Sequence, residues 1–321
     1  GVFRPRHADD GAAIARYARK EGIPLIPRAG GTSLAGQCVG EGLVVDVSRH
    51  MNAILEIDPE ARTARVQPGV IQDDLNDAAA PHGLLFAPDT STSKQANIGG
   101  MIGNNSCGAY SILYGTTRDH VIELEAVLGD GSRARFGELS AEELEQKKAL
   151  DTLEGEIYRT VCGILDEHRD EILADFPKPE VKRRNMGYAL DQLAYRQPWN
   201  PEGKPFSLVP LICGSEGTLA LVTEALLNLV PRPKNRALLC AHFRDVDETC
   251  RATVAALKHD PAAVELMDGV LLAATANNRE QTRNRFWVQG EPGGVLAIEL
   301  RDDDPATLDR RCEALVEDLK R

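Results

Sequence analysis

Three glycine-rich segments constrain this chain more than any other feature of its sequence. The first reads PRAGGTSLAGQ at residues 27–37, the second IGGMIGNNSCG at 98–108, and the third CGSEGT at 213–218. Adjacent glycines let several backbone N–H groups face one point without obstruction by Cβ, which suits the binding of phosphate oxygens. One such loop is also typical of a tight surface turn, but three in one chain indicate a single long ligand held at several points.

Polar side chains accompany these glycines. Thr32 and Ser33 add hydroxyl donors to the first loop, and the run PDTSTS at residues 88–93 precedes the second. Asn104 and Asn105 both donate and accept hydrogen bonds, as a ring edge with N–H and C=O groups requires. No glycine of the loops is followed by Lys, and the first loop leads into a strand, so neither the Walker nor the Rossmann pattern fits. We expect a dinucleotide bound outside a Rossmann fold.

Composition narrows the class of protein further. The chain has 321 residues, 42% of them hydrophobic, which predicts a globular protein of about two domains. Its net charge of -12 argues against binding nucleic acid or an anionic membrane. The sequence contains no run of 18 apolar residues, so no transmembrane segment is predicted. The seven dispersed cysteines contain no CxxC pair, which is typical of reduced cytoplasmic thiols and predicts no zinc or iron–sulfur site.

Local patterns predict an ordered series of elements. We expect helices at 10–20, capped by Asp9 or Asp10 and ended by Gly22, at 70–80, and at 141–176 with breaks near Leu150 and His168. Strands are expected at 24–27, 43–47, 54–57, 63–67, 121–128, 132–136 and 219–230. The Asp130-Gly131 pair predicts a hairpin turn. Residues 178–205 are expected to be irregular.

The run Pro231-Arg232-Pro233 predicts a domain boundary, which divides the chain into residues 1–233 and 234–321. Beyond it, strands at 237–243, 263–267 and 294–300 alternate with helices at 246–258, 269–276 and 305–320. This alternation is typical of an open α/β unit, and the series ends on a helix without a closing strand. The N-terminus GVFRP is neither an initiator Met nor a signal peptide, so we expect a region of a longer protein.

The loops resemble the FAD-binding domain of the vanillyl-alcohol oxidase and p-cresol methylhydroxylase (PCMH) superfamily. The closest resemblance is to D-lactate, glycolate and D-2-hydroxyglutarate dehydrogenases. Residues 99–108, followed by YGTTRD at 114–119, are similar to large bacterial flavoproteins with a C-terminal iron–sulfur domain. The resemblance implies an α+β fold, in which a two-subdomain FAD-binding domain of the PCMH type precedes a partial α/β cap domain that forms the substrate side.

The resemblance also implies roles for individual residues. The first loop would wrap the FAD pyrophosphate, the second would line the flavin and ribityl chain, and the third would close over the adenine and ribose. The implied cofactor residues are Pro27, Arg28, Ala29, Gly30, Gly31, Thr32, Ser33, Gln37, Pro88, Asp89, Thr92, Gly99, Gly100, Asn104, Asn105, Ser106, Gly108, Gly217 and Val222.

The segment RRNMGY at residues 183–188 resembles a family segment near the active-site face. Arg183 or Arg184 could pair with a substrate carboxylate, because a guanidinium fork matches a carboxylate. A solvated basic turn explains the two arginines equally well, and buried packing explains Tyr188. The paired His cluster of the related dehydrogenases is missing, so the sequence identifies no catalytic base and no metal ligand.

Two departures from the family pattern have consequences. Ala29 replaces a glycine of many relatives, which requires a negative φ at this residue. Relatives with covalent flavin often carry a His in the pyrophosphate loop, whereas Thr32 and Ser33 occupy that region here. The resemblance therefore implies non-covalent FAD. Cys107, next to the expected flavin, is interpreted as an inert packing residue.

The leading hypothesis is a flavin-dependent dehydrogenase that oxidises a 2-hydroxy acid to the 2-oxo acid. A hydride would pass from C2 to flavin N5, and the electrons would pass to an iron–sulfur or quinone acceptor. The enzyme would be cytoplasmic, either free or peripheral at the inner membrane face. The alternative is a flavin-binding electron-transfer module without a complete active site. A nicotinamide-linked dehydrogenase is disfavoured because the Rossmann fingerprint is missing.

Overall fold

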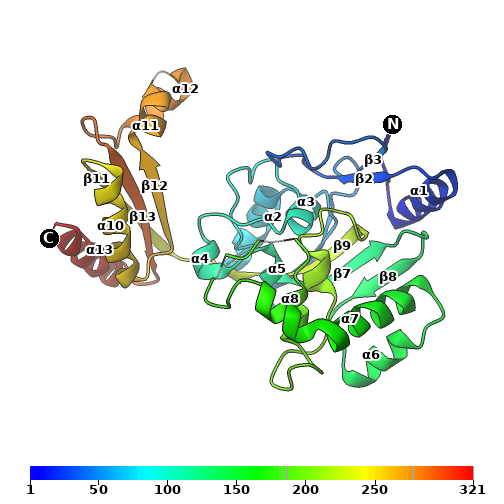
Figure 1. Cartoon of the computed structure of the whole chain (residues 1–321). Helices are drawn as coiled ribbons and strands as arrows, with labels where there is room; N and C mark the ends of the chain where they lie inside the picture. The colour runs from blue at the N-terminus through cyan, green and yellow to red at the C-terminus, as the bar shows by residue number, and fades with distance from the viewer. Residues whose placement is uncertain (182, 186, 277, 321) are drawn as a thin grey trace. The chain divides into compact units, whose positions relative to one another are not determined.

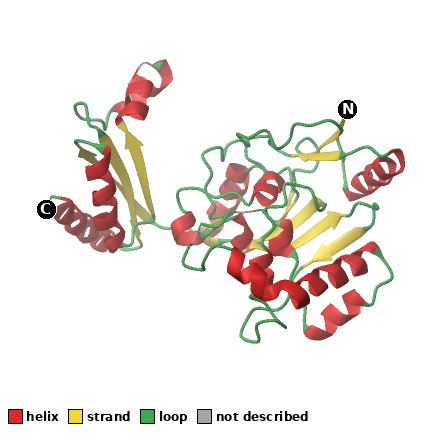
Figure 2. Ribbon diagram, viewed as in Figure 1, coloured by secondary structure: helices red, strands yellow, loops and turns green. Residues whose placement is uncertain are grey.

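The computed structural model describes residues 1–181, 183–185, 187–276 and 278–320. The chain divides into two compact units, Gly1–Pro231 and Arg232–Arg321. Figure 1 labels their elements along the chain, and Figure 2 shows that both units combine helices with strands. This mixture confirms the α+β fold class.

The first unit begins with a small parallel sheet. Its order is β1 (Val2–Phe3), β3 (Leu43–Asp46), β2 (Leu25–Arg28), and helix α1 (Ala8–Glu21) connects β1 to β2. The predicted cap at Asp9 or Asp10 is wrong, because the His7 side chain accepts the Asp10 N–H and both aspartates lie in the first turn. The predicted end at Gly22 is confirmed, since this residue is left-handed at φ 66°.

A larger antiparallel sheet forms the centre of the same unit. Its order is β4 (Ile54–Asp58), β5 (Thr63–Val66), β9 (Leu221–Asn228), β7 (Val121–Val127) and β8 (Arg133–Phe136). The predicted hairpin at Asp130-Gly131 joins β7 to β8, with Gly131 at φ 81°. Every second residue of β9 is buried, as expected for a strand with one face on the core. The short strands β6 (Leu84–Leu85) and β10 (Val230–Pro231) form a separate antiparallel pair.

Eight further helices belong to the described part of this unit, and their bounds are as follows. They are α2 (Gln72–Ala79), α3 (Ile98–Asn104), α4 (Ser111–Tyr114), α5 (Thr117–His120), α6 (Ala141–Lys148), α7 (Leu153–Asp175), α8 (Leu190–Ala194) and α9 (Val209–Ile212). The break predicted near Leu150 separates α6 from α7, but the break predicted at His168 is wrong. Helix α7 continues there because Val161, Leu165 and Ile172 keep one buried stripe.

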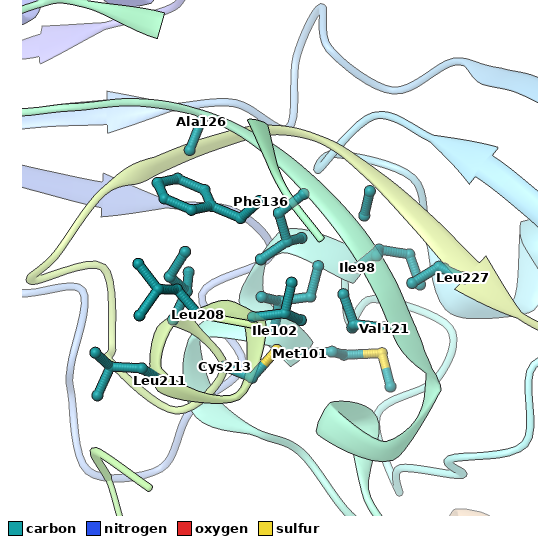
Figure 3. Packing of buried hydrophobic residues seen from close by; sticks show 14 of the residues in the cluster. Ile98, Met101, Ile102, Val121, Ala126, Phe136, Leu208, Leu211, Cys213 and Leu227 are labelled. Carbon is teal, nitrogen blue, oxygen red and sulfur yellow. The ribbon is translucent and has the colours of Figure 1, made fainter. Parts of the chain in front are cut away.

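The main core includes buried residues of the second and third glycine-rich loops. Met101 and Ile102 of α3 pack in one cluster with Leu211, Cys213 and the sheet residue Leu227 (Figure 3). A seven-residue segment with three glycines is thus helical because its apolar side chains are buried, which the sequence did not indicate. Helix α8 likewise lies within the region that we expected to be irregular.

The second unit is a three-stranded antiparallel sheet of order β11 (Asn235–Phe243), β13 (Gly294–Asp302), β12 (Ala263–Asp268). Helices α10 (Val246–Ala256) and α13 (Pro305–Leu319) pack on Leu296, Ile298 and Leu300 of the central strand. Two short helices, α11 (Gly269–Ala276) and α12 (Arg279–Thr282), follow β12. The predicted alternation of strands and helices is present, and both strand pairings are antiparallel.

Candidate cofactor site

The three glycine-rich loops meet at one place in the first unit. A Cβ on Gly30 would lie 2.3 Å from the Gln95 carbonyl oxygen, just before the second loop. A Cβ on Gly217, in the third loop, would lie 2.8 Å from Cγ of Pro27. The Glu216 N–H donates to the Gly103 carbonyl at 2.8 Å, which joins the third loop to the second. Segments separated by up to about two hundred residues in sequence therefore form one structure.

A groove runs between these loops, and most of the expected cofactor residues line it. From the first loop these are Pro27, Arg28, Ala29, Gly30, Gly31, Thr32, Ser33 and Gln37. From the other two segments they are Thr92, Gly99, Gly100, Ser106, Gly217 and Val222. Ala29 does not have the positive φ that would strain its methyl group.

Four backbone donors on the first loop remain available to a ligand. The N–H groups of residues 30–33 have no hydrogen-bond acceptor anywhere in the described part of the chain, and neither do the Thr32 and Ser33 hydroxyls. The Arg28 guanidinium lies beside Gly31 and has no carboxylate within ion-pair distance among the described residues. Free N–H groups on residues that line one groove beside a guanidinium suit the binding of a pyrophosphate.

Five of the expected cofactor residues do not line the groove. A Cβ on Gly108 would lie 1.0 Å from the Asp89 carbonyl oxygen, so these two backbones are in direct contact. The Pro88 carbonyl accepts a hydrogen bond from the Gln72 side chain, which is fully buried. Pro88, Asp89 and Gly108 thus hold the second loop in shape from outside the groove.

Asn104 and Asn105 also turn toward protein groups. Asn104 donates from Nδ2 to Glu216 Oε1 at 2.8 Å, which is a second link between the second and third loops. Asn105 is fully buried at the end of α3, with φ 50°, and its Oδ1 accepts the Arg118 N–H at 2.8 Å. Its Nδ2 has no partner among the described residues.

The third loop begins at a buried residue, Cys213. Cys213 is completely buried, and this burial raises the pKa of its thiol to about 12, which leaves it protonated and inert. The Gly214 N–H donates to the Ile102 carbonyl at 2.9 Å. Residues 215–217 then line the groove above this anchor.

The three expected substrate residues are not together. Arg184 pairs with the buried Asp191 at 2.6 Å and donates to the Pro177 carbonyl. Its guanidinium is therefore bonded to other residues of the protein. Arg183 is exposed and donates to Cys107 Sγ at 3.1 Å. The Tyr188 hydroxyl bonds to Thr218 Oγ1 at 2.6 Å. None of the three lines the groove. Met186, in the same segment, lies outside the described residues.

Sequence reasoning missed several residues of the groove. Asn97 is buried, donates from Nδ2 to the Gly69 carbonyl at 2.7 Å, and stands two positions before the paired glycines Gly99 and Gly100. That position was the only signal for it. Ile212 and Ala220 supply apolar lining, and nothing in their local sequence sets them apart.

The described residues contain neither a metal-ligand cluster nor a helix that could span a membrane. Across the described residues, no group of three or more His, Cys, Asp or Glu side chains is arranged to hold a metal ion. In the same residues, no helix has the length and hydrophobicity needed to cross a membrane.

Family models match both units of the chain. The model of the FAD binding domain covers residues 1–137, and that of the C-terminal domain of FAD linked oxidases covers residues 232–321. The D-2-hydroxyglutarate dehydrogenase of Pseudomonas putida is 37% identical over 98% of this chain and 31% of its own length. The glycolate oxidase subunit GlcD of Bacillus subtilis is 33% identical over 83% of this chain and 45% of its own length.

Solved structures share the fold at low identity. A crystal structure of p-cresol methylhydroxylase with substrate bound gives a TM-score of 0.66 at 14% identity, over 99% of this chain and 56% of that one. Alkyldihydroxyacetonephosphate synthase gives 0.65 at 16% identity, over 99% and 53%. The chain thus spans about a third of the first curated relatives and about half of these structures.

Proposed function

We propose that this chain, a member of the FAD-linked oxidoreductases, oxidises a 2-hydroxy acid to the 2-oxo acid. In this family an FAD binding domain precedes an FAD-linked oxidase C-terminal domain. The substrate is of the D-2-hydroxyglutarate, D-lactate or glycolate class. The observation that carries the proposal is the convergence of the three glycine-rich loops on one groove with unpaired N–H donors, in a chain 37% identical to a D-2-hydroxyglutarate dehydrogenase.

FAD is the cofactor, and the described residues fit it. We propose that the N–H groups of residues 30–33 and the Arg28 guanidinium bind the pyrophosphate, because a dianionic group requires convergent donors. Thr92, Gly99, Gly100 and Ser106 also line the groove, as do Gly217 of the third loop and Val222 of β9. No histidine is among the groove residues, which supports non-covalent binding.

The cofactor and the residues of the chain have different roles at this site. When bound, FAD would supply the redox chemistry as the acceptor of the hydride from C2 of the substrate, while the hydroxyl proton would pass to a general base. The chain's own residues position the cofactor by backbone contacts and exclude water from its apolar floor at Ile212 and Ala220. Arg183 is the candidate to hold the substrate carboxylate, since it is exposed and has no carboxylate partner in the described part of the chain. Electrons leave to an iron–sulfur or quinone acceptor.

A second candidate function is a flavin-binding electron-transfer module without turnover. It is favoured by the engagement of Arg184 with Asp191 and by the lack of a metal-ligand cluster in the described residues. Such a module would bind FAD and accept electrons from a reductant but not from a 2-hydroxy acid.

Anaerobic bleaching of the flavin separates the two functions. Protein reconstituted with FAD is mixed with D-2-hydroxyglutarate, D-lactate or glycolate, and the visible flavin band is followed, with the L-enantiomers of the two chiral acids as controls. Bleaching by a D-acid or glycolate supports the dehydrogenase. Reduction by light alone, with no bleaching by any acid, supports the module. The same test on a longer chain that includes the remaining length of the relatives decides whether this region needs further residues for turnover.

A further inference from the structure

Arg118 lies outside the groove yet contacts the backbone of several segments around it. Its Nε donates to the Pro210 carbonyl at 3.0 Å, and its Nη2 donates to the carbonyls of Cys213 at 2.6 Å and Gly187 at 3.1 Å. Its own N–H donates to Asn105 Oδ1 at 2.8 Å. One residue thus contacts four acceptor residues that are 13 to 95 positions away in sequence.

The second and third loops, which Arg118 contacts at Asn105 and Cys213, border the groove directly. Cys213 precedes Ser215, Glu216 and Gly217, which line the groove, and Asn105 precedes Ser106, which also lines it. Gly187 belongs to the segment that carries Arg183 and Tyr188. Gly214 has φ 95°, and a Cβ at this position would lie 2.7 Å from Arg118 Nη2, so the glycine gives the guanidinium access to the third loop.

The positive charge of the Arg118 guanidinium interacts with the dipoles of backbone carbonyl groups. No carboxylate lies within ion-pair distance of its guanidinium among the described residues, and its side-chain acceptors are all backbone carbonyls. Burial lowers the pKa of Arg118 from its usual value, although nearby acids oppose the change. A guanidinium fits this environment because its planar fork directs separate N–H groups to separate carbonyls, which a lysine ammonium on a flexible stem does not reproduce.

We propose that Arg118 is a positioning residue for the cofactor: it fixes the second and third loops and the segment of residues 187–188 against one another, and so sets the affinity for FAD without contacting it. This inference rests on the proposed binding of FAD in the groove. It adds to the groove residues a determinant of FAD affinity, Arg118, which lies outside the groove and acts by fixing the shape of the groove.

The test compares FAD affinity in three variants of the full chain. Arg118→Lys and Arg118→Ala remove the fork, whereas Arg196→Lys is the matched control. Arg196 is also a partly buried arginine that donates to a carbonyl, that of Pro205, and it lies outside the groove. Titration with FAD, followed by flavin fluorescence, gives Kd and stoichiometry, and far-ultraviolet circular dichroism establishes that each variant is folded.

We expect Kd for FAD to rise at least about tenfold in both Arg118 variants, with one-to-one stoichiometry, and to stay near the wild-type value in Arg196→Lys. Guanidinium ion added to Arg118→Ala restores part of the affinity, whereas methylammonium does not. A general loss of stability would not show this selectivity. If Arg118→Ala is unfolded, Arg118→Lys and Arg118→Gln carry the comparison.

Folded Arg118 variants that bind FAD as tightly as the wild type would overturn the inference, as would equal rescue by both cations. A wild-type chain that does not bind FAD would instead overturn the proposed function, so the two failures are distinguishable.

Discussion

Gly30 shows how one missing carbon sets the distance between two loops. A Cβ at this position would lie 2.3 Å from the Gln95 carbonyl oxygen, which belongs to backbone and has little room to move. We predict that Gly30→Ala destabilises the protein by about 1–3 kcal/mol and weakens FAD binding, because the first loop must move away from the second. Urea unfolding with and without FAD measures both effects.

Gly163 provides the matched control for this substitution. It lies within α7, and a Cβ there would meet no atom within 4 Å. Gly163→Ala should stabilise the protein by up to about 1 kcal/mol through helix propensity and leave FAD binding unchanged. Equal effects of the two substitutions would show that the close approach at Gly30 does not exist.

Glu123 links the stability of the large sheet to pH. Burial raises the pKa of its carboxyl group, but hydrogen bonds from Arg135 and Arg65 outweigh this and the net pKa is lowered. A carboxylate with a depressed folded-state pKa stabilises the protein above its unfolded pKa, and this contribution is lost as pH falls through the folded-state pKa.

We therefore predict that Glu123→Gln lowers the free energy of unfolding by about 1 kcal/mol at neutral pH. The difference between variant and wild type should shrink as pH falls below about 4, the usual pKa range of Glu. Urea unfolding at several pH values measures it. A difference that grows on acidification would contradict the ion pairs of Glu123.

At the scale of elements, the end of α1 depends on Gly22. This residue is left-handed at φ 66°, and its N–H donates to the Ala18 and Arg19 carbonyls. A Cβ there would meet no atom within 4 Å, so only the backbone conformation opposes substitution. We predict that Gly22→Ala costs about 1 kcal/mol and Gly22→Asn less, because Asn tolerates this conformation better. Thermal unfolding ranks the variants, and equal losses would contradict the left-handed cap.

Elements were predictable where the sequence marks their ends. Gly22 ends α1, and Asp130-Gly131 turns β7 into β8, because each uses a local backbone preference. Helix α3 was not predictable, since its glycines disfavour a helix and only the burial of Ile98, Met101 and Ile102 in the core stabilises it. The predicted break at His168 failed for the same reason, as a buried stripe outweighed a local polar run.

At the scale of the molecule, the sequence predicted that the three glycine-rich loops lie around one groove, but it did not predict the contacts that hold them in place. The paired glycines and hydroxyls single out residues 27–33, which line the groove and whose free N–H groups we propose bind the pyrophosphate. Asp89, Asn105 and Gly108 were expected in the groove, but they pack behind it, which depends on contacts that no local pattern encodes. Arg118 lies in the YGTTRD segment that the resemblance rests on, but no role could be predicted for it, because its side-chain acceptors are carbonyls 69 to 95 residues away.

The mode of FAD attachment is also a property of the whole molecule. Because no histidine lines the groove, we predict that acid precipitation or denaturant releases all of the flavin into the supernatant as intact FAD. Absorbance of the supernatant and pellet after precipitation measures the distribution. Flavin that remains on the unfolded chain would show a covalent link.

The most direct test of the account is a fluorescence titration of FAD with the chain, performed in parallel on the wild type, Gly30→Ala and Gly163→Ala. We predict saturable one-to-one quenching by the wild type and by Gly163→Ala, and a Kd raised at least about tenfold in Gly30→Ala, since the loops must separate by the width of a methyl group. No saturable binding by the wild type, or the same Kd in all three proteins, would contradict the claim that the three loops form one FAD groove.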